Sequence, residues 1–301
     1  MRHPKIYFLL IIIIVIWGLS WPVIKIGLQY MPPLWYAAFR MLIGMLSMFI
    51  IVAVAGKVIL PTRKDLPIIL VMGLLQMATF MILINLGLSH VEAGRSAILV
   101  YTTPIWVMPL AVLFFHEQTN FLKWIGFALG LVGILILFSP SAINWSDPTI
   151  VLGNGILLLS ALVWAISMLC ARNMKWPHAP FELVPWQLLV GTIPIFLIAS
   201  FEQPFAAIQW NPTLIGTLLF ACIFATAVAY WGTMVISKEL PSTTASLSFL
   251  AVPVAGLLFS ALLLGEPITL VKVIAMTCIL GGIFCEVISG RRLAKDRIRV
   301  D

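Results

Sequence analysis

The chain has 301 residues, of which 62% are hydrophobic and only 10% are charged, and its formal net charge is +7. Soluble globular proteins carry about 25% charged residues, so this chain has too few charges to cover a surface facing water, and lipid must surround most of it. The basic residues lie between apolar runs and form no basic face, which excludes nucleic acid as a partner. The four cysteines have no metal-site spacing, and the sequence contains no Walker loop, nucleophile elbow or metal-ligand cluster, so neither a metal nor a cofactor is expected.

Polar, charged and proline-rich breaks divide the chain into ten apolar runs, each long enough to form a helix across a bilayer core, which takes about 20 residues. The first run has no cleavage site after it, so we expect an uncleaved span and not a signal peptide. The predicted fold class is an all-α integral membrane protein, with spans at residues 6–28, 34–55, 66–88, 93–115, 120–139, 150–171, 180–200, 212–236, 241–264 and 268–290.

The distribution of lysine and arginine predicts the orientation of these spans. If the N-terminus lies inside, 14 of the 18 basic residues fall in inside segments, whereas only Arg95 and Lys272 fall outside. Positive charges concentrate on the cytoplasmic side of membrane proteins. We therefore expect a multi-pass protein of the inner (cytoplasmic) membrane with both termini in the cytoplasm, including a basic tail at residues 291–301.

The second half of the chain repeats the first. Residues of uncommon type match in order, first at an offset of 147 positions and later at 149 (Trp17 with Trp164, Ser20 with Ser167, Pro33 with Pro180, then Pro104 with Pro253, Glu117 with Glu266 and Lys123 with Lys272). Each predicted repeat, residues 6–139 and 150–290, holds five spans, and because five is odd the second repeat must be inverted in the membrane. Inverted repeats are the usual basis of alternating access around a substrate at the midplane.

The segments that carry the repeat also resemble a known family. They are Trp17–Pro22, Pro33–Gly44, and Ala97–Glu117 with its second copy Ala245–Glu266. This duplicated five-helix unit resembles the EamA domain of the drug/metabolite transporter superfamily over residues 6 to 290. The resemblance implies a ten-helix carrier, and most members are bacterial inner-membrane exporters of amino acids and related metabolites.

Aromatic and hydroxyl residues near the middle of their spans are candidates for the substrate site. Tryptophan usually lies at the membrane interface, but Trp17 and Trp164 lie mid-span, either packed against a neighbouring helix or lining a cavity. Ser20 and Ser167 follow one helical turn later on the same faces. The further candidates are Tyr101 and Thr103 beside Pro104, Tyr230 in the eighth span and Ser246 in the ninth.

Arg40 is the deepest charge, and its repeat counterpart is Gln187, so the resemblance implies a chemically asymmetric cavity. An arginine within the membrane costs several kcal/mol unless it is paired or hydrated. It either extends to the outer surface or has a partner inside the bundle, such as a substrate carboxylate or a freed backbone carbonyl. For Arg40 we favour a partner inside the bundle. For Lys25, at the end of the first span, we expect the side chain to extend to the outer surface.

Pro104 and Pro253 lie mid-span in the fourth and ninth spans, where each removes one helical hydrogen bond. Such symmetric breaks suit gating or binding, although simple kinks are equally compatible with the sequence. Gln76 and Asn85 are nine residues apart, half a turn out of phase in an α-helix, so we do not expect both to face one cavity.

These features predict a secondary transporter, not an enzyme, that exports small amino-acid-like or other zwitterionic or anionic metabolites. A multidrug or cationic-compound exporter is the alternative, but cation/proton antiport needs a carboxylate deep in the membrane. Glu286 lies near the cytoplasmic end of the last span, so we expect Glu286→Gln to leave transport intact. A membrane-bound transferase is a third reading, disfavoured because no Asp, His or Glu cluster is present. The oligomeric state is left open between monomer and homodimer.

Overall fold

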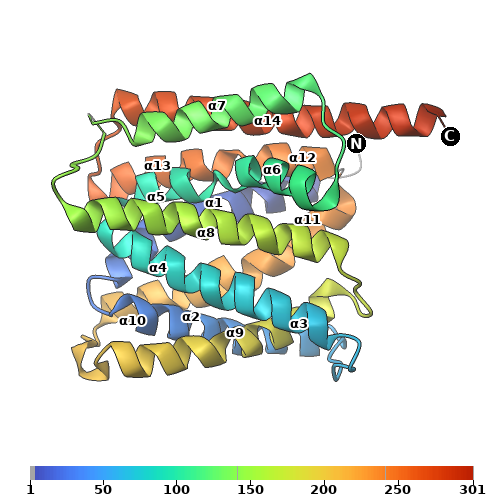
Figure 1. The fold of residues 1–301 in the computed structure, drawn as a ribbon. Coiled ribbons are helices and arrows are strands. Elements are labelled where there is room, and N and C mark those ends of the chain that lie inside the picture. Colours follow the sequence, from blue (N-terminus) through green and yellow to red (C-terminus); the bar gives the residue numbers. More distant parts are fainter. Residues whose placement is uncertain (1–3, 141, 241, 301) are drawn as a thin grey trace.

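The computed structural model describes residues 4–140, 142–240 and 242–300, and every regular element in these ranges is helical (Figure 1). The ten spans are α1 (Pro4–Gly27), α2 (Pro33–Val54), α3–η1–α4 (Leu66–Met72, Gly73–Thr79, Phe80–His90), α5–α6 (Ala93–Val100, Thr103–Phe115), α7 (Phe121–Leu137), α8 (Pro148–Asn173), α9 (Pro180–Glu202), α10–η3–α11 (Pro212–Leu219, Phe220–Val228, Ala229–Glu239), α12–α13 (Ser242–Phe249, Ala251–Leu264) and α14 (Leu270–Val300). A short 3-10 turn, η2 (Phe205–Ala207), lies between α9 and α10.

The predicted number of spans is confirmed. In the described chain nine helices are long and apolar enough to cross a membrane, and α7, an apolar helix of 17 residues, is the tenth. Both chain ends lie at the same end of the bundle, as an even number of spans requires (Figure 1). We call this end the terminal side and the other end the opposite side.

The fourth and ninth spans show the repeat at the level of single residues. α5 and α12 have the same length, and both of their ends are 149 residues apart. Each is followed by a break, at Tyr101 and at Leu250, after which the next helix begins close to Pro104 or Pro253. Both of those second helices end on a left-handed residue, His116 (φ 50°) and Gly265 (φ 68°), and a glutamate follows each.

The offset between the two repeats changes from 147 to 149 residues within their π-helices, η1 and η3. η1 begins 147 residues before η3 but ends 149 residues before it, because η1 contains seven residues and η3 contains nine. The two extra residues are accommodated by wide π turns, which form i→i+5 hydrogen bonds and are frequently found at functional sites. The third and eighth spans are therefore irregular at their centres.

The two repeats interlock instead of lying as separate bodies. α1 of the first half packs on α13 of the second, α4 packs on α8, and α7 lies alongside α14 at the top of the view in Figure 1. The last pair approaches closely, because a Cβ atom on Gly126 would lie 2.6 Å from the carbonyl oxygen of Gly282. Larger residues at this crossing would push the two helices apart.

A polar cluster ties the loop before α3 to the loop after α8 on the terminal side. Asp65 accepts hydrogen bonds from the backbone N–H and the hydroxyl of Thr62, at 2.8 and 2.6 Å, and its carboxylate lies 2.9 Å from Nδ1 of His178. Burial alone would raise the pKa of Asp65, but these hydrogen bonds favour the ionised form and hold the pKa at about 2. The carboxylate therefore stays charged at physiological pH and fixes both loops.

Candidate functional site

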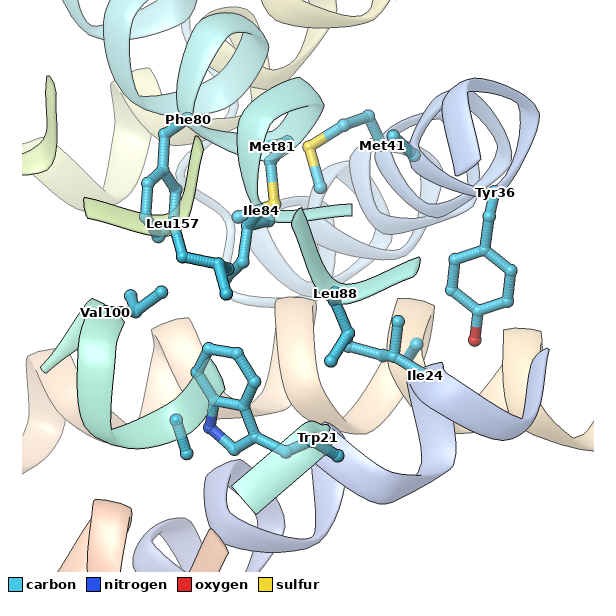
Figure 2. Packing of buried hydrophobic residues seen from close by; sticks show 14 of the residues in the cluster. Trp21, Ile24, Tyr36, Met41, Phe80, Met81, Ile84, Leu88, Val100 and Leu157 are labelled. Carbon is cyan, nitrogen blue, oxygen red and sulfur yellow. The ribbon is translucent and has the colours of Figure 1, made fainter. Parts of the chain in front are cut away.

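The central cavity, as we name it, lies between the two repeats and has an empty volume of about 710 Å³ including its mouth. Six of the predicted site residues line it: Trp17, Ser20, Arg40, Tyr101, Trp164 and Tyr230. Most of the other residues in its wall are apolar. They include Trp21, Ile24, Phe80, Met81, Ile84, Leu88 and Val100, whose packing is shown in Figure 2. The cavity is thus mainly apolar with a few polar groups, as small-molecule sites usually are.

Arg40 supplies the positive charge of the central cavity. Its side chain does not reach the membrane surface, because the residue is only 7% exposed within the bundle. Its Nε donates a hydrogen bond of 3.2 Å to Oγ1 of Thr226 on η3, and no ion pair of Arg40 occurs among the described residues. This hydroxyl is neutral and is not the freed backbone carbonyl named as a possible partner from the sequence, so the guanidinium has no counterion among the described residues.

The two mid-span tryptophans are held in place by other groups. Nε1 of Trp17 donates to the carbonyl of Ala225 at 3.3 Å, and its ring centroid lies 5.4 Å from that of Phe249. The ring of Trp164 lies 5.2 Å from Phe80 and meets the ring of Tyr101 edge-on at 6.1 Å. Both indoles therefore present fixed aromatic surfaces to the cavity.

Hydroxyl groups contribute less than the sequence predicts. The hydroxyls of Ser20 and Ser167 donate to the backbone carbonyls of Trp17 and Trp164, at 2.7 and 2.8 Å. Ser167 is fully buried and lines none of the cavities described here. Serines in membrane helices often form such bonds within their own helix, so the repeat relation does not make the two residues equivalent at the site.

Gln187 is another predicted site residue that lies away from the cavities. It is 1% exposed, on the face of α9 that packs against η1, where its backbone approaches Gly73. This packing mirrors that of Arg40 against η3, but the shorter glutamine side chain stays enclosed between the helices. The side chain of Ser246 lies outside the described residues.

Gln76 and Asn85, which we expected to be out of phase, both line the central cavity. The expectation was wrong because it assumed an α-helix throughout. Gln76 lies in η1, and a π turn contains more residues than an α turn, so the angle between the two side chains differs from half a turn. The slip in the repeat offset was the signal in the sequence that this span is irregular.

Asn85 has an unused acceptor. Its Nδ2 donates to the carbonyl of Met81 at 2.8 Å, whereas its buried Oδ1 has no hydrogen-bond partner among the described groups. Buried polar atoms almost always have a partner. An unpaired oxygen in a residue of the cavity wall therefore marks a position where a donor on a ligand would be stabilised.

A second cavity continues from the central one toward the terminal side and has an empty volume of about 1190 Å³ including its mouth. It shares Trp17, Tyr101 and Trp164 with the central cavity. The predicted residues Thr103 and Pro104 line it, whereas Pro253 is buried in α13 and lines neither cavity. Glu286 on α14 also lines it, although the sequence reading placed this residue too close to the helix end to matter.

The helix break beside this cavity has its free backbone groups satisfied. The hydroxyl of Thr103 donates to the carbonyl of Val100 at 2.7 Å, and that of Thr102 donates to the carbonyl of Leu99 at 2.6 Å. Such compensation lets a broken helix exist inside a membrane next to a cavity.

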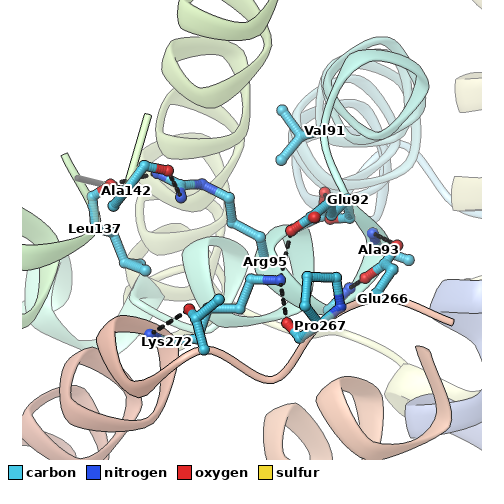
Figure 3. A network of polar contacts seen from close by, with 12 residues as sticks. Val91, Glu92, Ala93, Arg95, Leu137, Ala142, Glu266, Pro267 and Lys272 are labelled. Atoms are coloured by element: carbon cyan, nitrogen blue, oxygen red, sulfur yellow. Dashed lines mark hydrogen bonds and ion pairs between the residues drawn. The ribbon is translucent and has the colours of Figure 1, made fainter. Parts of the chain in front are cut away.

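On the opposite side, charged groups connect the two repeats (Figure 3). The carboxylate of Glu266 accepts hydrogen bonds of 2.6 and 2.9 Å from the backbone N–H groups of Ala93 and Gly94, at the start of α5. Lys272 forms an ion pair of 2.5 Å with Glu92 and also donates to the carbonyl of Pro267 at 2.8 Å. These contacts join the start of α5 to the end of α13 and the start of α14 on the opposite side.

Two further basic residues strengthen the opposite side. The guanidinium of Arg95 binds Oδ1 of Asn154 at 2.6 Å and the carbonyl of Ala142 at 2.8 Å. Lys25, which we expected to extend to the membrane surface, instead donates from Nζ to three carbonyls at the end of α4: those of Leu88 (2.6 Å), Ser89 (3.1 Å) and Val91 (2.9 Å). A cation is favourable there because the helix C-terminus is the negative end of its dipole.

On the terminal side, the corresponding glutamate has a different partner. Glu117 occupies the position equivalent to Glu266, directly after the left-handed residue that ends α6. It forms an ion pair with Arg172 at the end of α8, in an exposed position. The two ends of the molecule are thus held by different contacts in this conformation.

Comparison with known proteins agrees with this architecture. The uncharacterized transporter YvbV of Bacillus subtilis (strain 168) is 32% identical over 87% of this chain and 85% of its own length. A protein of Escherichia coli (strain K12), named a probable amino-acid metabolite efflux pump, is 29% identical over 93% of both chains. A probable terminal-alkyne amino-acid exporter of Streptantibioticus cattleyicolor is 25% identical over 88% of both chains.

A solved crystal structure superposes with a TM-score of 0.68 at 17% identity, over 96% of this chain and 98% of that one, and this likeness supports the fold alone. The family description and the names of the relatives identify transporters and not enzymes, so the transferase reading is excluded. The EamA-like transporter family matches residues 4–139 and 151–287, one match in each half. The chain therefore belongs to the EamA-like transporter family and is a multi-pass membrane transporter.

Proposed function

We propose that the protein exports small zwitterionic or anionic metabolites, with amino-acid-like compounds as the first candidates. The observation that carries the proposal is the guanidinium of Arg40, which faces the central cavity without a counterion. Removing such a charge from water is costly unless an opposite charge joins it. A substrate carboxylate can supply that charge through two parallel hydrogen bonds. Two of the relatives are named for the export of amino acids or their metabolites.

The remaining groups of the central cavity fit the other end of an amino acid. The unpaired Oδ1 of Asn85 can accept a hydrogen bond from a substrate ammonium group. The rings of Trp17, Trp164 and Tyr101 provide aromatic faces that attract a cation or an apolar side chain. A cationic drug is disfavoured, because no carboxylate lines the central cavity within the described part of the chain.

Alternating access is the mechanism that we propose for this export. The structure joins the repeats on the opposite side through Glu266 and the start of α5. Repeat symmetry places Glu117 in the equivalent position relative to the start of α12, residues 242 and 243. We infer that the two glutamates act as alternate latches: Glu266 holds the opposite side closed in this state, and Glu117 holds the terminal side closed in the other.

We further propose that the protein lies in the inner membrane with both termini in the cytoplasm. The excess of lysine and arginine on the terminal side supports this orientation. A reporter that is active only in the cytoplasm should function when fused after residue 301, and a periplasmic reporter at the same site should not. Activity of the periplasmic reporter alone would reverse the proposed orientation.

Counterflow in proteoliposomes tests the proposed substrate class. Purified protein is reconstituted with a labelled neutral amino acid outside and an excess of unlabelled compound inside. Related carboxylates should drive and compete for exchange, whereas their methyl esters and quaternary ammonium compounds should not, since only the carboxylate pairs with Arg40. Exchange driven by the cationic compounds in place of the carboxylates would contradict the proposal.

A further inference from the structure

Glu286 differs from the other acidic residues because it borders the transport pathway. It lines the second cavity together with Trp17, Tyr101 and Trp164, which also line the central cavity. No other carboxylate belongs to the walls of either cavity in the described residues. A carboxylate on a pathway through a membrane is costly and usually functional.

The surroundings of Glu286 leave its carboxylate available. No hydrogen bond or ion pair of this carboxylate occurs in the described part of the structure. On α7, Gly126 lies close to the backbone of Glu286. Lys123 on the same helix is the basic residue whose charge interacts with the carboxylate of Glu286. The described side chains that the other elements place on the cavity wall are uncharged: Trp17 (α1), Thr103, Pro104 and Val107 (α6), Trp164 and Met168 (α8), Thr233 (α11) and Phe249 (α12).

The expectation that Glu286 is too shallow to carry a proton rests on its position in the sequence. It lies only four residues before Gly290, the end of the apolar part of α14, and distance along a helix suggests a shallow group. The second cavity nevertheless extends to this depth, so Glu286 is accessible from the substrate pathway without being at the midplane. Access to the pathway, and not depth, decides whether a group can exchange protons with it.

We propose that Glu286 is the proton-binding group that couples substrate export to proton entry, an inference that rests on the proposed function. The ionised carboxylate binds one proton when the pathway faces the outside and releases the same proton to the cytoplasm. An ammonium group entering the pathway from the cytoplasm stabilises the ionised form and displaces the proton. Substrate and proton therefore exclude each other, which is the condition for antiport.

The test separates exchange from coupling. Counterflow needs no net movement of protons, so Glu286→Gln should still exchange substrate, at a rate lowered by the lost contact with the substrate ammonium group but clearly above that of protein-free liposomes. Accumulation driven by a pH difference needs the proton site. With the membrane potential held at zero by potassium and valinomycin, a pH difference of one unit supports up to about a tenfold concentration ratio for one proton per substrate. The unmodified protein should approach this ratio, and Glu286→Gln should remain at a ratio of about one.

Two further variants serve as controls. Glu286→Asp retains a carboxylate and should restore accumulation at least in part, whereas Glu202→Gln, at an exposed helix end, should behave as the unmodified protein. Undiminished accumulation by Glu286→Gln, or accumulation by the unmodified protein that ignores the pH difference, would overturn the coupling role. Absence of carboxylate counterflow in the unmodified protein would instead refute the proposed function, so the two failures are distinguishable.

Discussion

Replacing Arg40 with lysine should lower the rate of counterflow for carboxylate substrates by about 10- to 100-fold. The guanidinium offers two parallel hydrogen bonds to a carboxylate, whereas an ammonium group acts as a single charge. Loss of one charge-assisted hydrogen bond is worth about 1.5–3 kcal/mol, and about 1.4 kcal/mol corresponds to a factor of ten. Arg40→Gln, which gives both repeats the same residue, removes the charge as well and should lower transport further.

The measurement is counterflow in proteoliposomes, corrected for the amount of folded protein. Arg63→Gln, in an exposed loop on the terminal side, is the matched control for the loss of one positive charge. The thermal unfolding temperature of each variant should be compared with that of the unmodified protein, because an effect on packing would lower it whereas loss of a substrate contact would not. Full activity of Arg40→Lys and Arg40→Gln would mean that this arginine has a structural role and that the preference for an anionic group must be withdrawn.

Replacing Glu266 with glutamine should open the opposite side of the carrier. The charge of Glu266 strengthens two hydrogen bonds from the backbone at the start of α5, and charge-assisted bonds are roughly twice as strong as neutral ones. Loss of about 1.5–3 kcal/mol from the closed state would shift the equilibrium about 10- to 100-fold toward the state open on that side.

Cysteine labelling measures this shift. Ile24 lines the central cavity near the end of α1 on the opposite side, and Ile24→Cys in a background without the four native cysteines provides a reporter. An impermeant thiol reagent applied from outside should label it about tenfold or more faster after Glu266→Gln. Glu117→Gln, which removes the proposed latch of the other state, should leave labelling unchanged or slower. Equal labelling of all three proteins would contradict the alternate latches.

The sequence by itself determined the number of spans, their ends to within a few residues, and the duplication. A bilayer requires about 20 apolar residues per helix, and this demand is local, so it can be read without knowing which helices meet. The repeat could also be recognised from the sequence, since Pro104 and Pro253 mark helix breaks that lie at equivalent positions in the structure. Family membership follows from the same features.

Only the tertiary structure decided which polar groups face the cavities. Arg40 and Gln187 are equivalent in the repeat, yet only Arg40 lines the central cavity. The two repeats differ in sequence and in the length of their π-helices, so equivalent residues have different surroundings. The phase of Gln76 and Asn85 depended on a π-helix, whose wide turns break the regular helical period. Glu286 lines the second cavity because that cavity, formed between helices of both repeats, extends as far as α14. Such a cavity has no local signature in the sequence.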